Sequence, residues 1–275
     1  MNDLDWVTGD PVELRKAYAA ERAVLDATAP SDVAVSDDLP AGLEGLAFTP
    51  AGAEGRAPIL YFHGGSWMLG SPATHRALCA WLSKETARRV VSVCYPLAPE
   101  HPYPAQREAA KAARAAMGAQ ENDPIFVAGD SAGGAMALWG AGEETEGVLG
   151  VAAFYPAYGL TASPSISAHG PGNPALNAAA IAAMYDRLGA AGAEVQADIP
   201  TSGALVLVIA ATEDPLCDDS HALAAALAPR GVTLWEAEGE EHAFLHHGGA
   251  RPDVRTWLAR LGTWMDTQAR ARGCQ

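Results

Sequence analysis

The segment FVAGDSAGGAMA, residues 126–137, surrounds Ser131 with small residues directly after an apolar run. Gly129 and Gly133 complete the pattern G-x-S-x-G, which is typical of a serine nucleophile held on a sharp turn between a strand and a helix. Glycine is needed at both flanking positions because a Cβ there would collide with neighbouring backbone. We predict that Ser131 is a catalytic nucleophile. The alternative is a glycine-rich turn that carries an incidental serine.

A serine nucleophile needs hydrogen-bond donors for the oxyanion that forms after its attack. The segment HGGSW follows the strand-like run APILYF, and its glycines can present bare backbone N–H groups. We therefore expect an oxyanion hole made by Gly64, Gly65 and Ala132, the residue after the serine. The next residues of the segment, Ser66 and Trp67, should bind substrate at the border of the acyl-binding region. A glycine turn with a packed tryptophan is the alternative.

The serine also needs a general base, and His242 is the best placed of the eight histidines. It follows the last strand-like run, VTLWEA, after a short polar loop. A metal site is the alternative, because His242 and His246 stand four residues apart and would share a helix face. No H-E-x-x-H glutamate and no evident third ligand accompany them, so we expect no metal. We expect His63 to organise the oxyanion loop, and four further histidines to lie at the surface or pack in loops: His75, His101, His169 and His221.

The acid that orients the histidine should lie between the serine and the histidine in the chain. Asp214, in ATEDPLCDDS, follows the apolar run ALVLVIAA and so stands at the carboxyl end of a predicted strand. Its role would be to hold the imidazole tautomer and to stabilise the imidazolium that forms. Asp218 and Asp219 are close alternatives, but they better suit capping a helix that begins at Ser220.

These residues must be positioned by alternating strands and helices. Apolar, strand-like runs occupy residues 43–48, 57–63, 90–95, 124–129, 148–155, 204–211 and 232–237. Between or after them, helical patterns cover residues 73–88, 105–117, 132–141, 220–227 and 252–270. Continuous apolar strands separated by helices predict a mostly parallel central sheet with helices on both faces, the α/β class. We expect one domain over residues 1–275.

Two segments fall outside this alternation and should form a small cap over the active site, from about residues 1–40 and 155–203. The first holds a helix over residues 10–27, with Asp10 as N-cap, Pro11 at its first position and Glu13 able to complete a capping box. The second is too long for an ordinary crossover and should hold a helix near residues 175–188. The apolar face of the first helix is expected to comprise Leu14, Ala17, Tyr18, Val24 and Leu25.

Composition narrows the classes of partner. The net charge of −15 argues against nucleic acid and anionic membranes as partners, because both require basic patches. The longest apolar run, residues 204–211, is too short to span a bilayer, and the amino-terminal segment has no secretory pattern. We therefore expect a cytoplasmic location, and a homodimer stays open. The four cysteines are expected to be free thiols, with Cys94 a small buried hydrophobe: Cys79, Cys94, Cys217 and Cys274.

Together the motifs resemble the bacterial hormone-sensitive-lipase-like esterases of the α/β-hydrolase fold. The matching stretches are HGGSW, YPLAPEHPYPA, GDSAGG, DPLCD and HAF, in that order. The resemblance implies a triad of Ser131, Asp214 and His242, the same oxyanion donors as above, and no cofactor. Three residues depart from the family pattern without touching the triad: Ser66, Pro96 and Ala135.

We expect a serine carboxylesterase that acts on small esters with short acyl chains through an acyl-enzyme intermediate. A C–N hydrolase such as an arylformamidase is the first alternative, because its relatives also carry HGG-W stretches. A non-catalytic small-molecule receptor on the same fold is the second. Receptors of that kind have lost the catalytic histidine, whereas His242 is present here.

Overall fold

The computed structural model describes residues 4–121, 124–143 and 146–274. Within these ranges the strands form one sheet in the order β1-β2-β4-β3-β5-β6-β7-β8. The pairs β1–β2 and β2–β4 are antiparallel, and every pair from β4 to β8 is parallel. The predicted α/β class is confirmed. The strands are β1 Val33–Ser36, β2 Gly45–Pro50, β3 Ile59–Phe62, β4 Val90–Val93, β5 Ile125–Asp130, β6 Val148–Phe154, β7 Val206–Ala211 and β8 Val232–Ala237.

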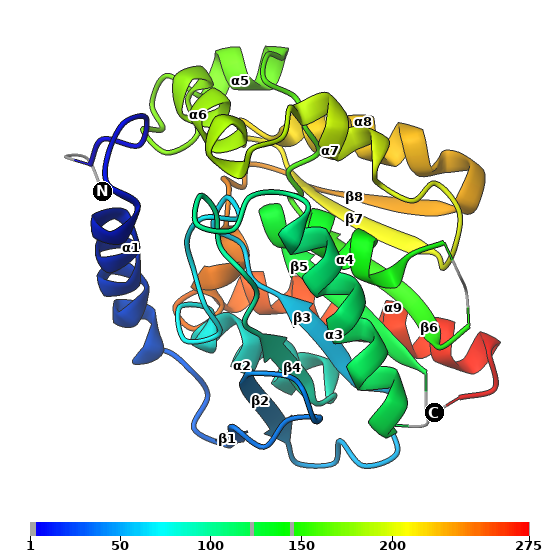
Figure 1. Ribbon diagram of the computed structural model, residues 1–275. Helices are drawn as coiled ribbons and strands as arrows, with labels where there is room; N and C mark the ends of the chain where they lie inside the picture. The colour runs from blue at the N-terminus through cyan, green and yellow to red at the C-terminus, as the bar shows by residue number, and fades with distance from the viewer. Residues whose placement is uncertain (1–3, 122–123, 144–145, 275) are drawn as a thin grey trace.

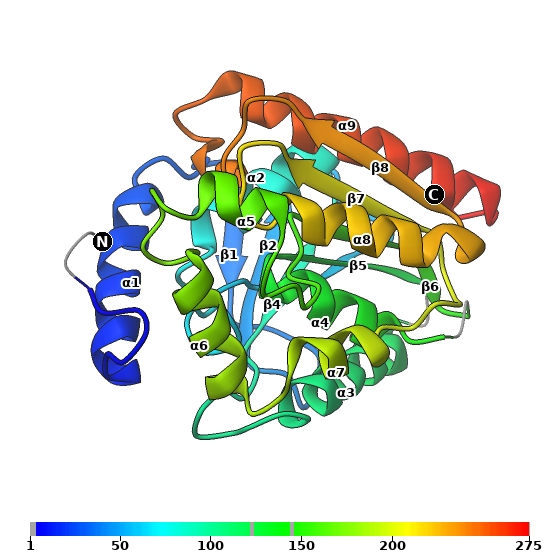
Figure 2. The same ribbon diagram turned by 90° about the horizontal axis from the view of Figure 1, so that it is seen from above.

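Helices cover both faces of this sheet (Figure 2). One core lies under α2 (Arg76–Thr86) and α9 (Pro252–Ala271). The other lies under α3 (Ala105–Glu121), α4 (Ala132–Ala141) and α8 (Cys217–Leu227). Because both faces are covered, β3 to β7 are buried along their whole lengths, which explains their unbroken apolar sequences.

Strand β1 was not expected from the sequence. Its four residues, VAVS, are alternately buried and partly exposed at the edge of the sheet, so they give no apolar run. The other strands all lie within or beside their predicted ranges, and α4 matches its predicted range of 132–141. The helix expected at 220–227 begins earlier, at Cys217.

The parallel arrangement brings four loops to one edge. The strands β3, β5, β7 and β8 run in the same direction, so their carboxyl ends meet there. These ends lead into the HGGSW segment, Ser131, Asp214 and His242, in that order. Ligands of open α/β sheets bind at this edge.

Two separate stretches of chain lie beyond this edge (Figure 1). One is the amino-terminal stretch with α1 (Pro11–Asp26). The other follows β6 and holds α5 (Pro164–His169), α6 (Ala178–Leu188) and α7 (Gly192–Ala197), where the sequence predicted at least one helix, near residues 175–188. The guanidinium of Arg187 on α6 ties the two together by donating to the carbonyl oxygens of Val7 and Gly9, at 3.0 and 2.7 Å.

Helix α1 begins as expected but its details differ. The carboxylate of Asp10 accepts the N–H groups of Val12 and Glu13, and Pro11 occupies the first turn. The Glu13 side chain binds Lys16 at 2.8 Å rather than closing a capping box. The expected apolar face is narrower than predicted: Leu14 and Tyr18 are buried, whereas Val24 is 73% exposed.

All four cysteines are free thiols, as expected. The expectation that Cys94 is buried is wrong. It lies just beyond β4, where the strand leaves the core, and its side chain is exposed.

Candidate active site

Ser131 sits on a strained turn between β5 and α4. Its φ of 54° and ψ of −122° lie in a region that costs a non-glycine residue free energy. Its neighbours leave no room for side chains: a Cβ on Gly129 would lie 2.1 Å from the carbonyl oxygen of Gly133. A Cβ on Gly133 would lie 2.1 Å from that of Phe62. The glycines of the motif are therefore required by close backbone packing.

His242 and Asp214 form a hydrogen-bonded chain with this serine. The Nε2 atom of His242 lies 3.1 Å from Oγ of Ser131, and its Nδ1 lies 2.7 Å from Oδ2 of Asp214. Asp214 is fully buried, and its Oδ1 accepts the backbone N–H of Leu216 at 2.8 Å. With the carboxylate on Nδ1, the Nε2 lone pair is directed at the serine hydroxyl, which is the arrangement a general base needs.

The HGGSW loop brings the backbone amides of Gly65 and Ser66 to the serine, whereas those of Gly64 and Gly65 were expected. The N–H of Gly64 donates to Oδ1 of Asp130 at 2.9 Å, so it is directed away from any oxyanion, and that expectation is not met. Gly65 and Ser66 both line the cavity beside Ser131. Their backbone N–H groups, and that of Ala132, form no bond to a described residue. Gly65 has a φ of 117°, a conformation that favours glycine.

Trp67 does not take part in this cavity as expected. Its side chain is 0% exposed and packs against Trp139 and Tyr185, with ring centroids 6.2 and 5.8 Å away. Among the described residues, it is absent from the cavity lining. Trp67 therefore anchors the loop in the core rather than contacting substrate. His63 stays in the loop as predicted: its Nδ1 lies 2.9 Å from the carbonyl oxygen of Gly64, and burial lowers its pKa to about 3.

The cavity beside Ser131 measures about 130 Å³. Its walls come from the HGGSW loop, from the loops that carry Ser131 and His242, and from both segments beyond the sheet edge. Large side chains reach it from those two segments. They include Trp6, Tyr18 and Arg22 from the amino-terminal part and Asn173 and Leu176 from the part after β6.

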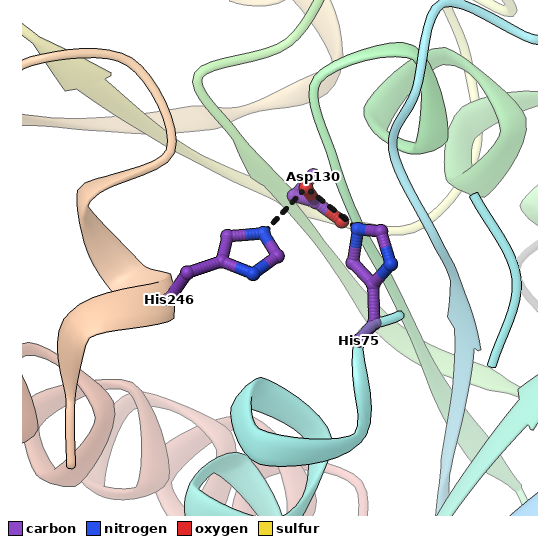
Figure 3. A group of neighbouring side chains, drawn as sticks. All are labelled: His75, Asp130 and His246. Carbon is purple, nitrogen blue, oxygen red and sulfur yellow. Dashed lines mark hydrogen bonds and ion pairs between the residues drawn. The ribbon is translucent and has the colours of Figure 1, made fainter. Parts of the chain in front are cut away.

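Behind the serine lies a fully buried group of three side chains, His75, Asp130 and His246 (Figure 3). The Oδ2 atom of Asp130 lies 3.4 Å from Nε2 of His75 and 3.3 Å from Nε2 of His246. Its Oδ1 accepts the hydroxyl of Tyr61 at 2.6 Å as well as the Gly64 N–H. Burial alone would raise the pKa of Asp130, but the two imidazoles outweigh it and hold that pKa well below its usual range.

The same three side chains are the described residues that could share one metal ion, since their ligand atoms lie within 4.8 Å of one another. Each of the facing atoms already has a hydrogen-bonding partner, so we interpret the group as a brace that joins the serine turn to the HGGSW loop. His75 is buried and packs against the HGGSW loop, so of the two placements expected for it, surface or loop packing, the second holds. His246 faces Asp130 whereas His242 faces Ser131, so these two histidines do not share the helix face that the metal alternative required.

Asp218 and Asp219 lie inside the first turn of α8 rather than capping it. Oδ1 of Asp219 instead accepts the backbone N–H groups of Tyr158, Gly159 and Leu160, where the chain leaves β6. Asp218 accepts the N–H of Ser165 at the start of α5. Both aspartates therefore hold the segment after β6 in place, and among the described contacts neither binds His242 as Asp214 does.

The brace and Arg22 were not predicted from the sequence. The position of Asp130 within G-x-S-x-G was a usable signal, because it is the residue next to the nucleophile. His75, His246 and Arg22 stand outside any motif. Their roles arise only from the folding of distant segments onto one another.

A larger cavity of about 500 Å³ lies away from this site, between α3, the end of α4 and the residues after α7. It holds none of the residues predicted to do chemistry. Its lining includes Arg107, Lys111 and Arg114.

Comparison with known proteins identifies the family. Residues 59–246 match the family described as the alpha/beta hydrolase fold. The chain belongs to this family. The matched range contains Ser131, Asp214 and His242, as well as the HGGSW loop.

Known hydrolases of this fold resemble the chain to different extents. An esterase of Pyrobaculum calidifontis is 28% identical, with a TM-score of 0.84 over 95% of this chain and 94% of that one. A versiconal hemiacetal acetate esterase of Aspergillus parasiticus is 42% identical over 101 residues, which are 35% of this chain and 32% of that protein. An esterase of Acinetobacter venetianus is 45% identical over 82 residues, 29% and 27% of the two chains. The match thus spans about a third or less of these two curated relatives.

The predicted α/β-hydrolase family and fold are confirmed, and the resemblance to hormone-sensitive-lipase-like esterases extends to the fold. An esterase of the bacterial hormone-sensitive lipase family superimposes with a TM-score of 0.84 at 24% identity. In the part of the chain that the structure describes, no helix combines the length and apolarity needed to cross a membrane.

Proposed function

We propose that this protein is a serine carboxylic-ester hydrolase that acts on small esters with short acyl chains. One observation carries the proposal: His242 lies 3.1 Å from the hydroxyl of Ser131 and 2.7 Å from the buried carboxylate of Asp214. The esterases among its relatives support the same reaction class.

In the first half of the reaction, Oγ of Ser131 attacks the acyl carbon while His242 takes the hydroxyl proton at Nε2. The carbonyl oxygen becomes an oxyanion, for which the N–H groups of Gly65, Ser66 and Ala132 are the available donors. Gly64 is not assigned to this role because Asp130 holds its N–H. Collapse of the intermediate breaks the ester bond, and the imidazolium gives its proton to the departing alkoxide.

In the second half, His242 removes a proton from water, which attacks the acyl-enzyme. The bond to Oγ of Ser131 then breaks, the imidazolium returns its proton to that oxygen, and the carboxylic acid is released. The carboxylate of Asp214 stabilises the imidazolium in both halves. The intact histidine favours this reading over a receptor. A small cap formed by the two segments beyond the sheet edge would enclose the substrate.

The net charge of −15 fits a small-molecule substrate rather than nucleic acid. The cytoplasmic location and the homodimer stay predictions, as do the single domain and the absence of a cofactor.

The test is covalent labelling by a fluorophosphonate together with hydrolysis of 4-nitrophenyl acetate and N-formylkynurenine. The wild type should be labelled once and should cleave the acetate faster. Ser131→Ala should lose both labelling and hydrolysis with nearly unchanged Tm, because the serine hydroxyl makes few stabilising contacts. Labelling of the alanine variant would reject Ser131, and faster cleavage of the formamide would favour the C–N hydrolase.

A further inference from the structure

The cavity beside Ser131 contains a guanidinium that has no carboxylate partner among the described residues. Arg22, on α1, lines the cavity together with Ser131 and His242. Its Nε is buried and donates to no described group. The guanidinium carbon lies 4.9 Å from the ring centre of Tyr18, and no described carboxylate forms an ion pair with it.

Other enclosed arginines of this chain do have partners. Arg88, which is fully buried, binds Asp266 at 2.7 Å and the carbonyl oxygen of Ala57 at 2.9 Å. Arg15, also on α1, binds Glu100 at 2.6 Å. A charge withdrawn from water without a partner is unfavourable, so Arg22 is set up to gain from an incoming anion.

The remaining polar groups on these walls are mostly donors. Trp6 lines the cavity, and its indole Nε1–H is buried without a described partner. Oδ1 of Asn173 already accepts the N–H groups of Ala175 and Leu176 at 3.1 Å, which leaves its amide NH₂ group free to donate. A wall rich in donors is complementary to a ligand rich in acceptors.

Asp130 is the one carboxylate in the described lining, and it does not neutralise Arg22 directly. Its Oδ1 accepts from Tyr61 and Gly64, and its Oδ2 faces the imidazoles of His75 and His246 (Figure 3). The positive charge at the cavity therefore stays available to a ligand.

We infer that Arg22 recognises a carboxylate on the substrate, so that the preferred substrates are small esters bearing a second, ionised acid group. This inference rests on the proposed ester hydrolysis and specifies its substrate class. A guanidinium binds a carboxylate through two parallel hydrogen bonds, which gives orientation as well as attraction. On a chain of net charge −15, an anionic substrate needs such a local positive group to bind.

The experiment compares esters that differ in one carboxylate. For the alcohol side, the pair is 4-acetoxybenzoate and its methyl ester. For the acyl side, it is the mono-4-nitrophenyl ester of adipic acid and 4-nitrophenyl hexanoate. The readout is the ratio of kcat/KM for the charged ester to that for the neutral one, each divided by its spontaneous hydrolysis rate. In the wild type the ratio should exceed one for at least one pair, and the pair that responds tells which side of the ester carries the acid.

Arg22→Met should lower that ratio at least about tenfold, the effect expected from losing a charge-assisted hydrogen-bond pair. Arg22→Lys keeps the positive charge but cannot form two parallel hydrogen bonds. Its charged-to-neutral ratio should therefore lie between that of the wild type and that of Arg22→Met. Lys16→Met is the matched control, because it removes one exposed positive charge from the same helix and should leave the ratio unchanged.

An unchanged ratio in Arg22→Met would overturn the inference even if both rates fell together, since Arg22 would then only support the structure around Asp130. Wild-type ratios below one in both pairs would also overturn the inference. This outcome needs no variant, so the inference can be tested even if Arg22→Met does not fold. If the wild type hydrolyses the neutral esters, the proposed ester hydrolysis is supported whether or not the ratio depends on Arg22. Failure of the wild type to cleave any ester or to react with the fluorophosphonate would reject function and inference together.

Discussion

Asp130 and Gly64 join the two segments that bracket the reacting centre: Oδ1 of Asp130 accepts the backbone N–H of Gly64 at 2.9 Å. Asp130 ends β5, directly before Ser131, and Gly64 lies in the loop after β3. The bond fixes the HGGSW loop relative to the serine turn. It also directs the Gly64 amide inward and leaves the amides of the next two residues at the cavity.

Replacing Asp130 by alanine should therefore reduce both stability and activity. The change leaves His75, His246 and the Tyr61 hydroxyl buried without their carboxylate partner. Removing one partner of a buried network of this kind typically lowers the free energy of unfolding by about 3–5 kcal/mol. Asp130→Asn retains an acceptor for Gly64 and should be milder. Thermal melts and kcat/KM for 4-nitrophenyl acetate measure the two effects. Asp186→Ala, at an exposed position on α6, is the control; a wild-type Tm in Asp130→Ala would refute the brace.

Ser131, His242 and Asp214 should behave as one unit. His242→Ala and Asp214→Asn should each lower kcat by about 10⁴-fold or more, because one removes the base and the other its orienting partner. The double variant should be little worse than His242→Ala, since the aspartate acts only through the histidine. The control is His221→Ala, an exposed histidine that pairs with Glu236. Near-normal turnover by Asp214→Asn would transfer the orienting role to another acid.

How far the sequence predicts this site depends on whether a residue's role is local. Ser131 and its flanking glycines are recognised because the turn geometry demands those residue types at fixed spacing. Asp214 and His242 follow from their places after strands, because parallel strands end at one edge. The alternation of strands and helices predicted the sheet for the same reason.

Gly64, Trp67 and Asp219 show where sequence reasoning stops. Two adjacent glycines look equally suited to donate, and only the position of Asp130 decides between them. Trp67 was expected beside the substrate because it follows the donors, but a φ of 55° accompanies its burial against Trp139. Asp219 resembles a helix cap in sequence, yet its partners lie about sixty residues away in the chain.

Asp219 should make stability depend on pH. Burial raises its pKa to about 7, although three backbone N–H groups act in the opposite direction. Between pH values of about 4 and 7 the unfolded chain loses this proton while the folded chain retains it. The contribution of Asp219 to the free energy of unfolding is therefore greatest below about pH 4 and falls as the pH rises to about 7.

The measurement is Tm at pH 5 and pH 8 at one ionic strength. Relative to Asp219→Asn, the wild type should be more favoured at pH 5 than at pH 8, because the variant has no proton to lose. Asp218→Asn is the control: the N–H of Ser165 lowers the pKa of Asp218, so the contribution of Asp218 changes only below about pH 4, and the difference from the wild type should be the same at pH 5 and pH 8. Parallel pH dependences in the wild type and Asp219→Asn would show that this carboxyl does not titrate in that range.

The last prediction concerns acyl length. The cavity of about 130 Å³ is well below the roughly 300 Å³ at which sites for drug-sized ligands begin, and Trp6, Tyr18 and Leu176 stand in its walls. Each buried methylene contributes about 0.8 kcal/mol, but only while the cavity has room for it. We therefore expect kcat/KM to peak at acyl chains of about two to six carbons, with no increase at a lipid interface.

Kinetics with 4-nitrophenyl esters from acetate to palmitate, with and without emulsified lipid, give the profile. Leu176→Ala should move the maximum to a longer chain, because it removes a wall of the cavity without touching Ser131 or His242. Val24→Ala, on the exposed face of α1, should leave the maximum in place. A wild-type maximum at ten carbons or beyond, or a jump in rate at the emulsion surface, would mean that the amino-terminal segment and the segment after β6 open to admit a long chain. The small cavity would then be one closed form of a larger site, and the short-chain assignment would be wrong.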